Sequence, residues 1–144
     1  MSGVGNAHDL DRFVAAQDGS WPAALAELRA GRKTSHWMWF VFPQVAGLGQ
    51  SPTAKHYELA GLEEARAYLD HEVLGPRLLA CCRALLELDD GSTAEQVLGS
   101  VDAMKLRSSM TLFAHADPSE AAFRDVLDRY YDGVEDERTV ALLG

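Results

Sequence analysis

The feature that most constrains this sequence is a run of large apolar side chains between His36 and Gln44. Two of the three Trp residues and two of the five Phe residues fall within it. Because aromatic side chains bury more area than any others, we expect the run to lie in the core, either as a plain core segment or as the wall of a pocket. Pro43 ends any regular element, and Gly47 and Gly49 permit a sharp turn beyond it. We predict a buried helical turn followed by an extended piece.

The totals indicate one domain. A chain of 144 residues with 47% apolar side chains can bury a substantial core. Its apolar runs are shorter than a membrane span, and its start has neither the basic nor the apolar part of a secretory signal. We therefore expect a cytoplasmic protein that forms a single domain over residues 1–144, with residues 1–8 as a flexible tail.

Apolar residues at helical spacing, separated by turns that contain Gly or Pro, recur along the chain. Several expected helix starts combine a capping residue with Pro or Glu close behind it: Ser20 with Pro22, Ser51 with Pro52, Ser92 with Glu95, and Asp117 with Pro118 and Glu120. The sequence offers no second convincing strand to pair with the aromatic run. We predict an all-α, compact multihelical domain of about seven to eight helices with little or no sheet.

The formal net charge of −9 argues against nonspecific binding to nucleic acid or to an anionic membrane, which requires a positive surface. The densest basic group is Arg29, Arg32 and Lys33, directly before the aromatic run, and it permits a local pocket for a small anion. We identify no cofactor motif and no metal-ligand spacing among the His and Cys residues. Cys81 and Cys82 are expected to be small hydrophobes on a helix.

The helix predicted over 101–115 carries polar residues on the same side as large apolar ones such as Leu106. Asp102, Lys105 and Ser109 lie on this side. One interpretation is an ion pair between Asp102 and Lys105 at the rim of the core, because a buried charge needs a partner. The other is a polar pocket in which Lys105 binds an anion, Asp102 orients or activates water, and Ser109 donates a hydrogen bond.

The aromatic run supplies further candidates. His36 can transfer a proton or bind a ligand because histidine titrates near neutrality, or it can be a partly buried residue with one backbone partner. Trp37 and Trp39 either belong to the core or stack on a base or a sugar. Gln44 either binds an amide or a base edge, or satisfies backbone groups in the turn.

The loop at residues 47–52 enters a helix N-terminus, whose free N–H groups can bind phosphate or carboxylate. It is neither a phosphate-binding P-loop nor a dinucleotide-binding fingerprint, because the required residues and frame are missing. Gly49 and Ser51 are its candidate ligand-binding residues. The alternative is an ordinary capped helix start.

The sequence resembles an actinobacterial member of the uncharacterised-domain family numbered 1810, sometimes mislabelled calpastatin in bacteria. The resemblance covers nearly the whole chain and implies a compact, mostly helical fold without an established activity. It is carried by Arg12-Phe13-Val14 with Gln17, Gly31-Arg32-Lys33, the run from His36 to Gln44, Gly47-Leu48-Gly49 with Ser51, Tyr57, Tyr68-Leu69 with His71, Leu74-Gly75 with Arg77-Leu78, Asp102, Lys105, Ser108-Ser109-Met110-Thr111-Leu112-Phe113, and Thr139-Val140-Ala141-Leu142-Leu143. A fainter likeness, in Lys105, Met110 and Phe113, is to the NADAR/YbiA-like helical N-glycosidases, which act on ribose-linked nucleotide derivatives.

Two functional hypotheses from different classes follow. The first is a small-molecule binding protein or hydrolase for an anionic nucleotide- or ribose-like ligand, similar to an N-glycosidase in its enzymatic form. Its catalytic candidates are Asp102 and His36, and its ligand-binding candidates are Trp37, Trp39, Gln44, Gly49, Ser51, Lys105, Ser108 and Ser109. The second is a noncatalytic helical protein-interaction module, in which these polar groups pair internally and an apolar patch is exposed.

Overall fold

The computed structural model describes residues 9–144, which form ten helices and one isolated β-bridge. The tail expected over residues 1–8 lies outside this range. The helices are α2 (Asp11–Asp18), α3 (Trp21–Ala30), α4 (Met38–Val41), α5 (Pro52–His56), α6 (Leu62–Asp70), α7 (Leu74–Leu86), α8 (Ala94–Leu98), α9 (Ser100–Ala116), α10 (Ala121–Tyr131) and α11 (Glu137–Leu143). The all-α prediction is confirmed. The described helices outnumber the expected seven to eight because α4, α5 and α8 are short, with four or five residues each.

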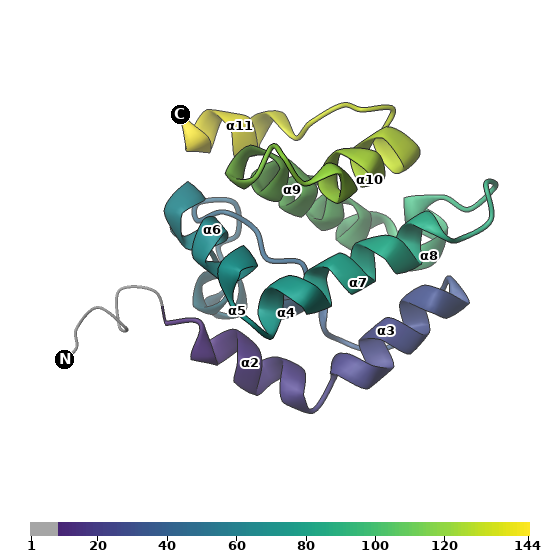
Figure 1. Ribbon diagram of the computed structural model, residues 1–144, viewed down its shortest axis with the longest axis horizontal. Helices are drawn as coiled ribbons and strands as arrows, with labels where there is room; N and C mark the ends of the chain where they lie inside the picture. Colours follow the sequence, from purple (N-terminus) through teal and green to yellow (C-terminus); the bar gives the residue numbers. More distant parts are fainter. Residues whose placement is uncertain (1–8) are drawn as a thin grey trace.

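Helix α9 organises the packing of the other helices. It contacts α6, α8, α10 and α11, and α7 contacts α3, α6 and α10. Figure 1 places α9, α10 and α11 together at one side of the molecule and α2 and α3 at the opposite side. Every residue from 108 to 114 is buried because neighbouring helices cover this half of α9 on all sides. The N-terminal half is different, since Val101 and Met104 are exposed there.

The aromatic run forms the buried helical turn and the extended piece that its sequence predicts. Trp37 precedes α4 as its N-cap residue and, like Phe42 at the other end of the turn, is fully buried. The extended piece that follows pairs Val45 with Leu59 in an isolated parallel bridge. The run therefore lies in the core and leads directly to the loop before α5.

Tertiary hydrogen bonds hold α4 at both ends. Before the helix, the Glu27 carboxylate of α3 accepts a hydrogen bond from the indole N–H of Trp37 at 2.9 Å. In its second half, the Phe40 carbonyl accepts hydrogen bonds from Gln17 Nε2 at 2.7 Å and from the Tyr68 hydroxyl at 3.3 Å. A single helical turn is unstable in isolation, so these partners on α2, α3 and α6 fix its position.

The predicted caps are correct at one helix and displaced at others. Ser51 caps α5 by accepting the Ala54 N–H at 3.1 Å, as expected. Ser20 does not cap α3, because its hydroxyl instead donates to the Ala16 carbonyl at 2.8 Å. The capping box of α8 uses Thr93 and Gln96, one residue later than the predicted pair of Ser92 and Glu95. Ser92 and Thr93 are adjacent hydroxyl residues, and Glu95 and Gln96 respectively follow them three positions later. The sequence pattern therefore allows a capping box in either register.

The start of α10 is also later than predicted. Asp117 does not cap the helix, since its Oδ1 accepts hydrogen bonds from the backbone N–H and the hydroxyl of Ser119 and closes a turn. The helix begins at Ala121, with Glu120 as its N-cap residue. This start places the apolar side of α10 against the core.

Within residues 9–144, no helix combines the length and the apolar character needed to cross a membrane.

Candidate ligand-binding site

Asp102, near the start of α9, pairs with two lysines. Its Oδ1 lies 3.3 Å from Lys105 Nζ and its Oδ2 lies 2.9 Å from Lys33 Nζ. The three side chains are mostly buried, with exposed fractions of 11% for Lys33 and 17% for the other two. The predicted ion pair between Asp102 and Lys105 is confirmed, and a second cation from the loop before α4 joins it. Because two cations share one carboxylate, this cluster carries an excess positive charge.

Each lysine of the cluster also lies over a tryptophan ring. Lys105 Nζ is 3.5 Å from the centre of the Trp39 ring, and Lys33 Nζ is 5.4 Å from that of Trp37. A cation over an aromatic face is attracted by the ring quadrupole. Trp37 is fully buried, whereas Trp39 is half-buried and so offers ring surface to a ligand.

Glu27 fixes the segment that carries both tryptophans. Its Oε1 accepts hydrogen bonds from the N–H groups of Thr34 at 2.7 Å and Ser35 at 3.0 Å, and its Oε2 accepts one from the Ser35 hydroxyl at 2.5 Å. Burial raises the pKa of Glu27, but the hydrogen bonds from Ser35, Thr34 and Trp37 favour the charged form more strongly and lower this pKa to about 2. The carboxylate is therefore ionised at neutral pH and orders residues 34–37.

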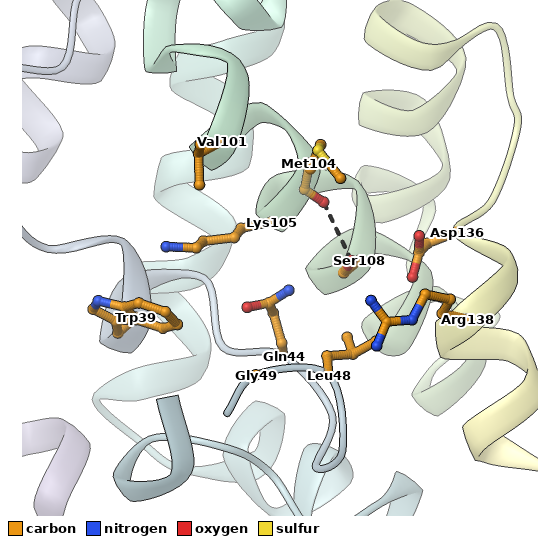
Figure 2. Close-up of a pocket in the computed structure, with 10 residues that line it drawn as sticks. All are labelled: Trp39, Gln44, Leu48, Gly49, Val101, Met104, Lys105, Ser108, Asp136 and Arg138. Carbon is orange, nitrogen blue, oxygen red and sulfur yellow. Dashed lines mark hydrogen bonds between the residues drawn. The ribbon is translucent and has the colours of Figure 1, made fainter. Parts of the chain in front are cut away.

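A hollow with a volume of about 210 Å³ lies between the end of the aromatic run, the first half of α9 and the start of α11 (Figure 2). We call it the main hollow because it contains five of the eight ligand-binding candidates. Its lining residues are Trp39, Gln44, Leu48, Gly49, Val101, Met104, Lys105, Ser108, Asp136 and Arg138. In Figure 2 the Gln44 amide points into the hollow from below, between the side chains of Lys105 and Arg138.

The polar groups of the main hollow differ in their availability. Asp136 is committed to capping α11, because its Oδ2 accepts hydrogen bonds from the N–H of Thr139 at 3.0 Å and from its hydroxyl at 2.6 Å. Ser108 donates its hydroxyl hydrogen to the Met104 carbonyl at 3.2 Å. Among the described residues, the side chains of Gln44 and Arg138 have neither a hydrogen-bonded nor an ion-paired partner. These two, together with Lys105 and the half-buried Trp39, are the side chains of the main hollow that can bind a ligand.

Gly49 lines the main hollow for a packing reason. A Cβ atom at this position would lie 2.4 Å from the Cβ of Ala54, far inside normal contact. Only glycine allows the loop to pass this close to α5. Ser51, the other candidate of the loop, does not line the main hollow and acts as the cap of α5.

Two further hollows adjoin the main one, and Trp39 borders all three. The first, which we call the lysine cleft, has a volume of about 120 Å³ and is lined by Lys33, His36, Trp37, Met38, Trp39, Asp102 and Lys105. The second, which we call the aromatic hollow, is wider, with a volume of about 770 Å³, and is lined by His36, Trp39, Phe40, Pro52, Thr53, His56 and Tyr57. Lys105 separates the main hollow from the lysine cleft, since it lines both.

Most residues singled out from the sequence meet around these hollows. The main hollow contains Trp39, Gln44, Gly49, Lys105 and Ser108, and the lysine cleft contains His36, Trp37 and Asp102. His36 is exposed, which contradicts the interpretation of a partly buried histidine with a backbone partner. Ser109 is fully buried, lines none of the three hollows, and has no hydrogen-bonded partner for its hydroxyl among the described residues.

Two residues that line the main hollow, and the role of Lys33 in the lysine cleft, are not predicted by the sequence analysis. Arg138 and Asp136 lie at the start of α11, where the sequence only indicated a terminal helix. Lys33 belongs to the basic group before the aromatic run, but its pairing with Asp102 is not evident from the sequence. A signal existed for Lys33, because a basic turn directly before two tryptophans suits cation–π contacts. No local pattern links Arg138 to α9.

The site defines a class of helical protein with a cationic hollow bordered by a tryptophan. The sequence model described as "Protein of unknown function (DUF1810)" matches residues 7–143, so the chain belongs to this family, as its resemblance implied. The chain is similar to a conserved hypothetical protein, Rv1873 from Mycobacterium tuberculosis, whose crystal structure superposes with a TM-score of 0.92. The two are 52% identical over 94% of this chain and 96% of that one. No curated protein matches the chain.

Proposed function

We propose that this protein binds a small anionic molecule of the sugar-phosphate or nucleotide class in the main hollow. The observation that carries the proposal is the sharing of Asp102 by Lys33 and Lys105, which leaves a mostly buried positive charge without a carboxylate of its own. A charge removed from water is costly unless an opposite charge accompanies it. An anion bound beside Lys105 would supply that charge.

The other available groups of the main hollow suit the same ligand. Arg138 adds a second cation and can bind a phosphate or a carboxylate through two parallel hydrogen bonds. The Gln44 amide offers both a donor and an acceptor, which matches the hydroxyl groups of a sugar. The volume of about 210 Å³ lies below the ~300–1,000 Å³ of pockets for drug-sized molecules, so the part of the ligand held here is small.

The geometry favours a binding role for Asp102 over water activation. Both of its carboxylate oxygens are paired with lysines, so neither oxygen is left to accept a proton from a water molecule. In this account Asp102 positions Lys105 over Trp39. The enzymatic alternative is hydrolysis of an N-glycosidic bond, with Asp102 and His36 as catalytic residues. It predicts that the protein releases a free base from a ribose-linked substrate, which can be measured directly.

The test of the binding proposal is thermal unfolding of the full chain with ribose 5-phosphate, inorganic phosphate and uncharged ribose. A ligand that binds only the folded state raises the midpoint as its concentration rises. We expect ribose 5-phosphate to raise the midpoint and ribose not to. Lys105→Ala should abolish the rise, and Lys55→Ala, at an exposed lysine outside the hollows, should retain it. No rise with the wild type, or an equal rise in Lys105→Ala, would overturn the proposal.

A second candidate function, a protein-interaction module, is favoured by one observation. Val101 and Met104, beside the main hollow, have exposed fractions of 64% and 72%. Neighbouring exposed apolar side chains are typical of an interaction surface. Sedimentation equilibrium tests its simplest form, self-association. That form predicts a dimer in the wild type and a monomer when both residues are replaced by serine, whereas a wild-type monomer at all concentrations contradicts it.

A further inference from the structure

We propose that the aromatic hollow between α4 and α5 holds the planar heterocyclic ring of the same ligand, so that the ligand is a nucleotide rather than a simple sugar phosphate. The inference rests on the proposed function, because it takes the anionic group to lie beside Lys105. It adds a second subsite, a named set of side chains and a narrower ligand class.

The faces of the aromatic hollow suit a flat ring. The half-buried rings of Trp39, Phe40 and Tyr57 form much of its wall. The centres of the Phe40 and Tyr57 rings are 5.3 Å apart with a tilt of 53°, so the two rings support each other. Phe13 also packs on Tyr57, with ring centres 5.8 Å apart. A nucleobase has a large π-face, and aromatic side chains stack on such faces in single-stranded nucleic-acid recognition.

The edges of the hollow supply hydrogen-bonding groups that are not used elsewhere. The imidazoles of His36 and His56, the Tyr57 hydroxyl and the Trp39 indole N–H have no hydrogen-bonded partner among the described residues. The His56 ring is held against Tyr57, with ring centres 4.6 Å apart and planes at 80°. Donors and acceptors around an aromatic wall are the groups that bind the edge of a heterocycle.

The distribution of charge separates the two subsites. The aromatic hollow is lined by no Lys, Arg, Asp or Glu, whereas the main hollow contains Lys105 and Arg138 besides Asp136, whose carboxylate caps α11. Trp39 borders both hollows, and Lys105 Nζ lies 3.5 Å from the centre of its ring. A ligand that spans Trp39 would therefore place an uncharged ring on one side and an anionic group on the other. A nucleoside monophosphate has this arrangement.

The test is isothermal titration calorimetry of the full chain with ribose 5-phosphate and with the four common nucleoside 5′-monophosphates. Stacking of one base predicts that at least one monophosphate binds roughly 5- to 150-fold more tightly than ribose 5-phosphate. Tyr57→Leu and His56→Ala should reduce this gain without changing the affinity for ribose 5-phosphate. His56→Ala keeps the fold at low risk because His56 is exposed, and Lys55→Ala on the same helix is the control that should retain the gain.

Three other outcomes of the titrations would each contradict a specific part of the two proposals. If ribose 5-phosphate binds and every monophosphate binds no more tightly, the ring subsite is wrong and the proposed function stands. If a monophosphate gains affinity but both variants retain the gain, the ring lies elsewhere and the assignment to the aromatic hollow is wrong. If neither kind of ligand binds, the proposed function and the ring subsite are both overturned.

Discussion

Lys105 Nζ lies 3.5 Å from the centre of the Trp39 ring, and the same ammonium group lies 3.3 Å from Asp102 Oδ1. Three kinds of group therefore fix one positive charge: an aromatic face, a carboxylate and the helix that carries the lysine. A cation held in this way has lost side-chain freedom before a ligand arrives. Preorganisation of this kind increases affinity because the side chain loses little further conformational entropy when the ligand binds.

Replacement of Trp39 by leucine tests this relationship. We expect Trp39→Leu to lower the free energy of unfolding by about 1–2 kcal/mol, because it removes a cation–π contact and part of a half-buried ring. It should also weaken ribose 5-phosphate binding by about tenfold, since Lys105 loses its platform. Urea denaturation and titration calorimetry measure the two effects.

Trp21→Leu is the matched control for that variant. Trp21 is half-buried and has the Arg77 guanidinium 5.3 Å from its ring centre, but it borders none of the three hollows. Its replacement should cost similar stability and leave the affinity unchanged. Equal losses of affinity in both variants would mean that Trp39 acts through general stability alone.

Glu27 predicts a specific dependence of stability on pH. Its pKa falls from the ordinary value of 4.5 to about 2 in the folded protein, so the folded state holds this proton less tightly than the unfolded state does. The resulting stabilisation is complete above pH 4.5 and is lost as the pH falls through 4.5 towards 2. Glu27→Gln should be less stable than the wild type by about 1–2 kcal/mol at pH 7, because hydrogen bonds to a charged acceptor are lost.

The measurement is urea denaturation of the wild type and of Glu27→Gln between pH 7 and pH 2. The difference in unfolding free energy should shrink as the pH falls from about 4.5 towards 2, because Glu27 binds a proton in the unfolded wild-type chain over this range while it stays ionised in the folded protein. A difference that stays constant over this range would show that Glu27 is not held as a carboxylate by residues 34–37.

A side chain at Gly75 should cause a severe packing defect at the contact between α6 and α7. A Cβ atom there would lie 2.1 Å from the backbone oxygen of Leu69, which cannot move without displacing α6. We expect Gly75→Ala to lower the free energy of unfolding by about 3 kcal/mol or more. Gly91→Ala is the control, since a Cβ atom at Gly91 meets nothing within 4 Å, and it should change stability by less than about 0.5 kcal/mol.

The two adjacent thiols should be unreactive in the folded protein. Cys81 and Cys82 are buried and free, and burial raises the pKa of Cys81 to about 12 and the pKa of Cys82 well above its usual 9. The thiolate is the reactive species, so both should resist a thiol reagent such as dithionitrobenzoate at pH 8. Unfolding in guanidinium chloride should expose both thiols, and both should then react with the reagent together. Rapid reaction of either thiol in the native state would contradict this burial.

The sequence predicted the fold class because its signals were local. The aromatic run, ended by Pro43, indicated a buried turn followed by an extended piece, and the structure has this form at α4. Helix starts were less accurate where neighbouring residues could serve equally well, as with Ser92 and Thr93. The position of Ser20 in sequence could not reveal that its hydroxyl would bond to the preceding helix.

The candidate site was predicted only where its contacts are close in sequence. Asp102 and Lys105 are three residues apart on one helix, so their ion pair followed from helical geometry. Lys33 reaches Asp102 because its own N–H donates to the Val97 carbonyl at 2.7 Å, a tertiary contact with α8. Arg138 reaches the hollow because α11 packs on α9. Such contacts depend on the packing of distant segments, which no local pattern encodes.

The most direct test of the central claim, that Lys105 holds the anionic group of a ligand, is calorimetric titration of ribose 5-phosphate into the wild type, Lys105→Ala and Lys55→Ala. A charge-assisted hydrogen bond is worth about 1.5–3 kcal/mol, so the dissociation constant should rise by roughly 10- to 150-fold in Lys105→Ala and stay unchanged in Lys55→Ala. Equal affinity in all three proteins, or no binding by the wild type, would contradict the account.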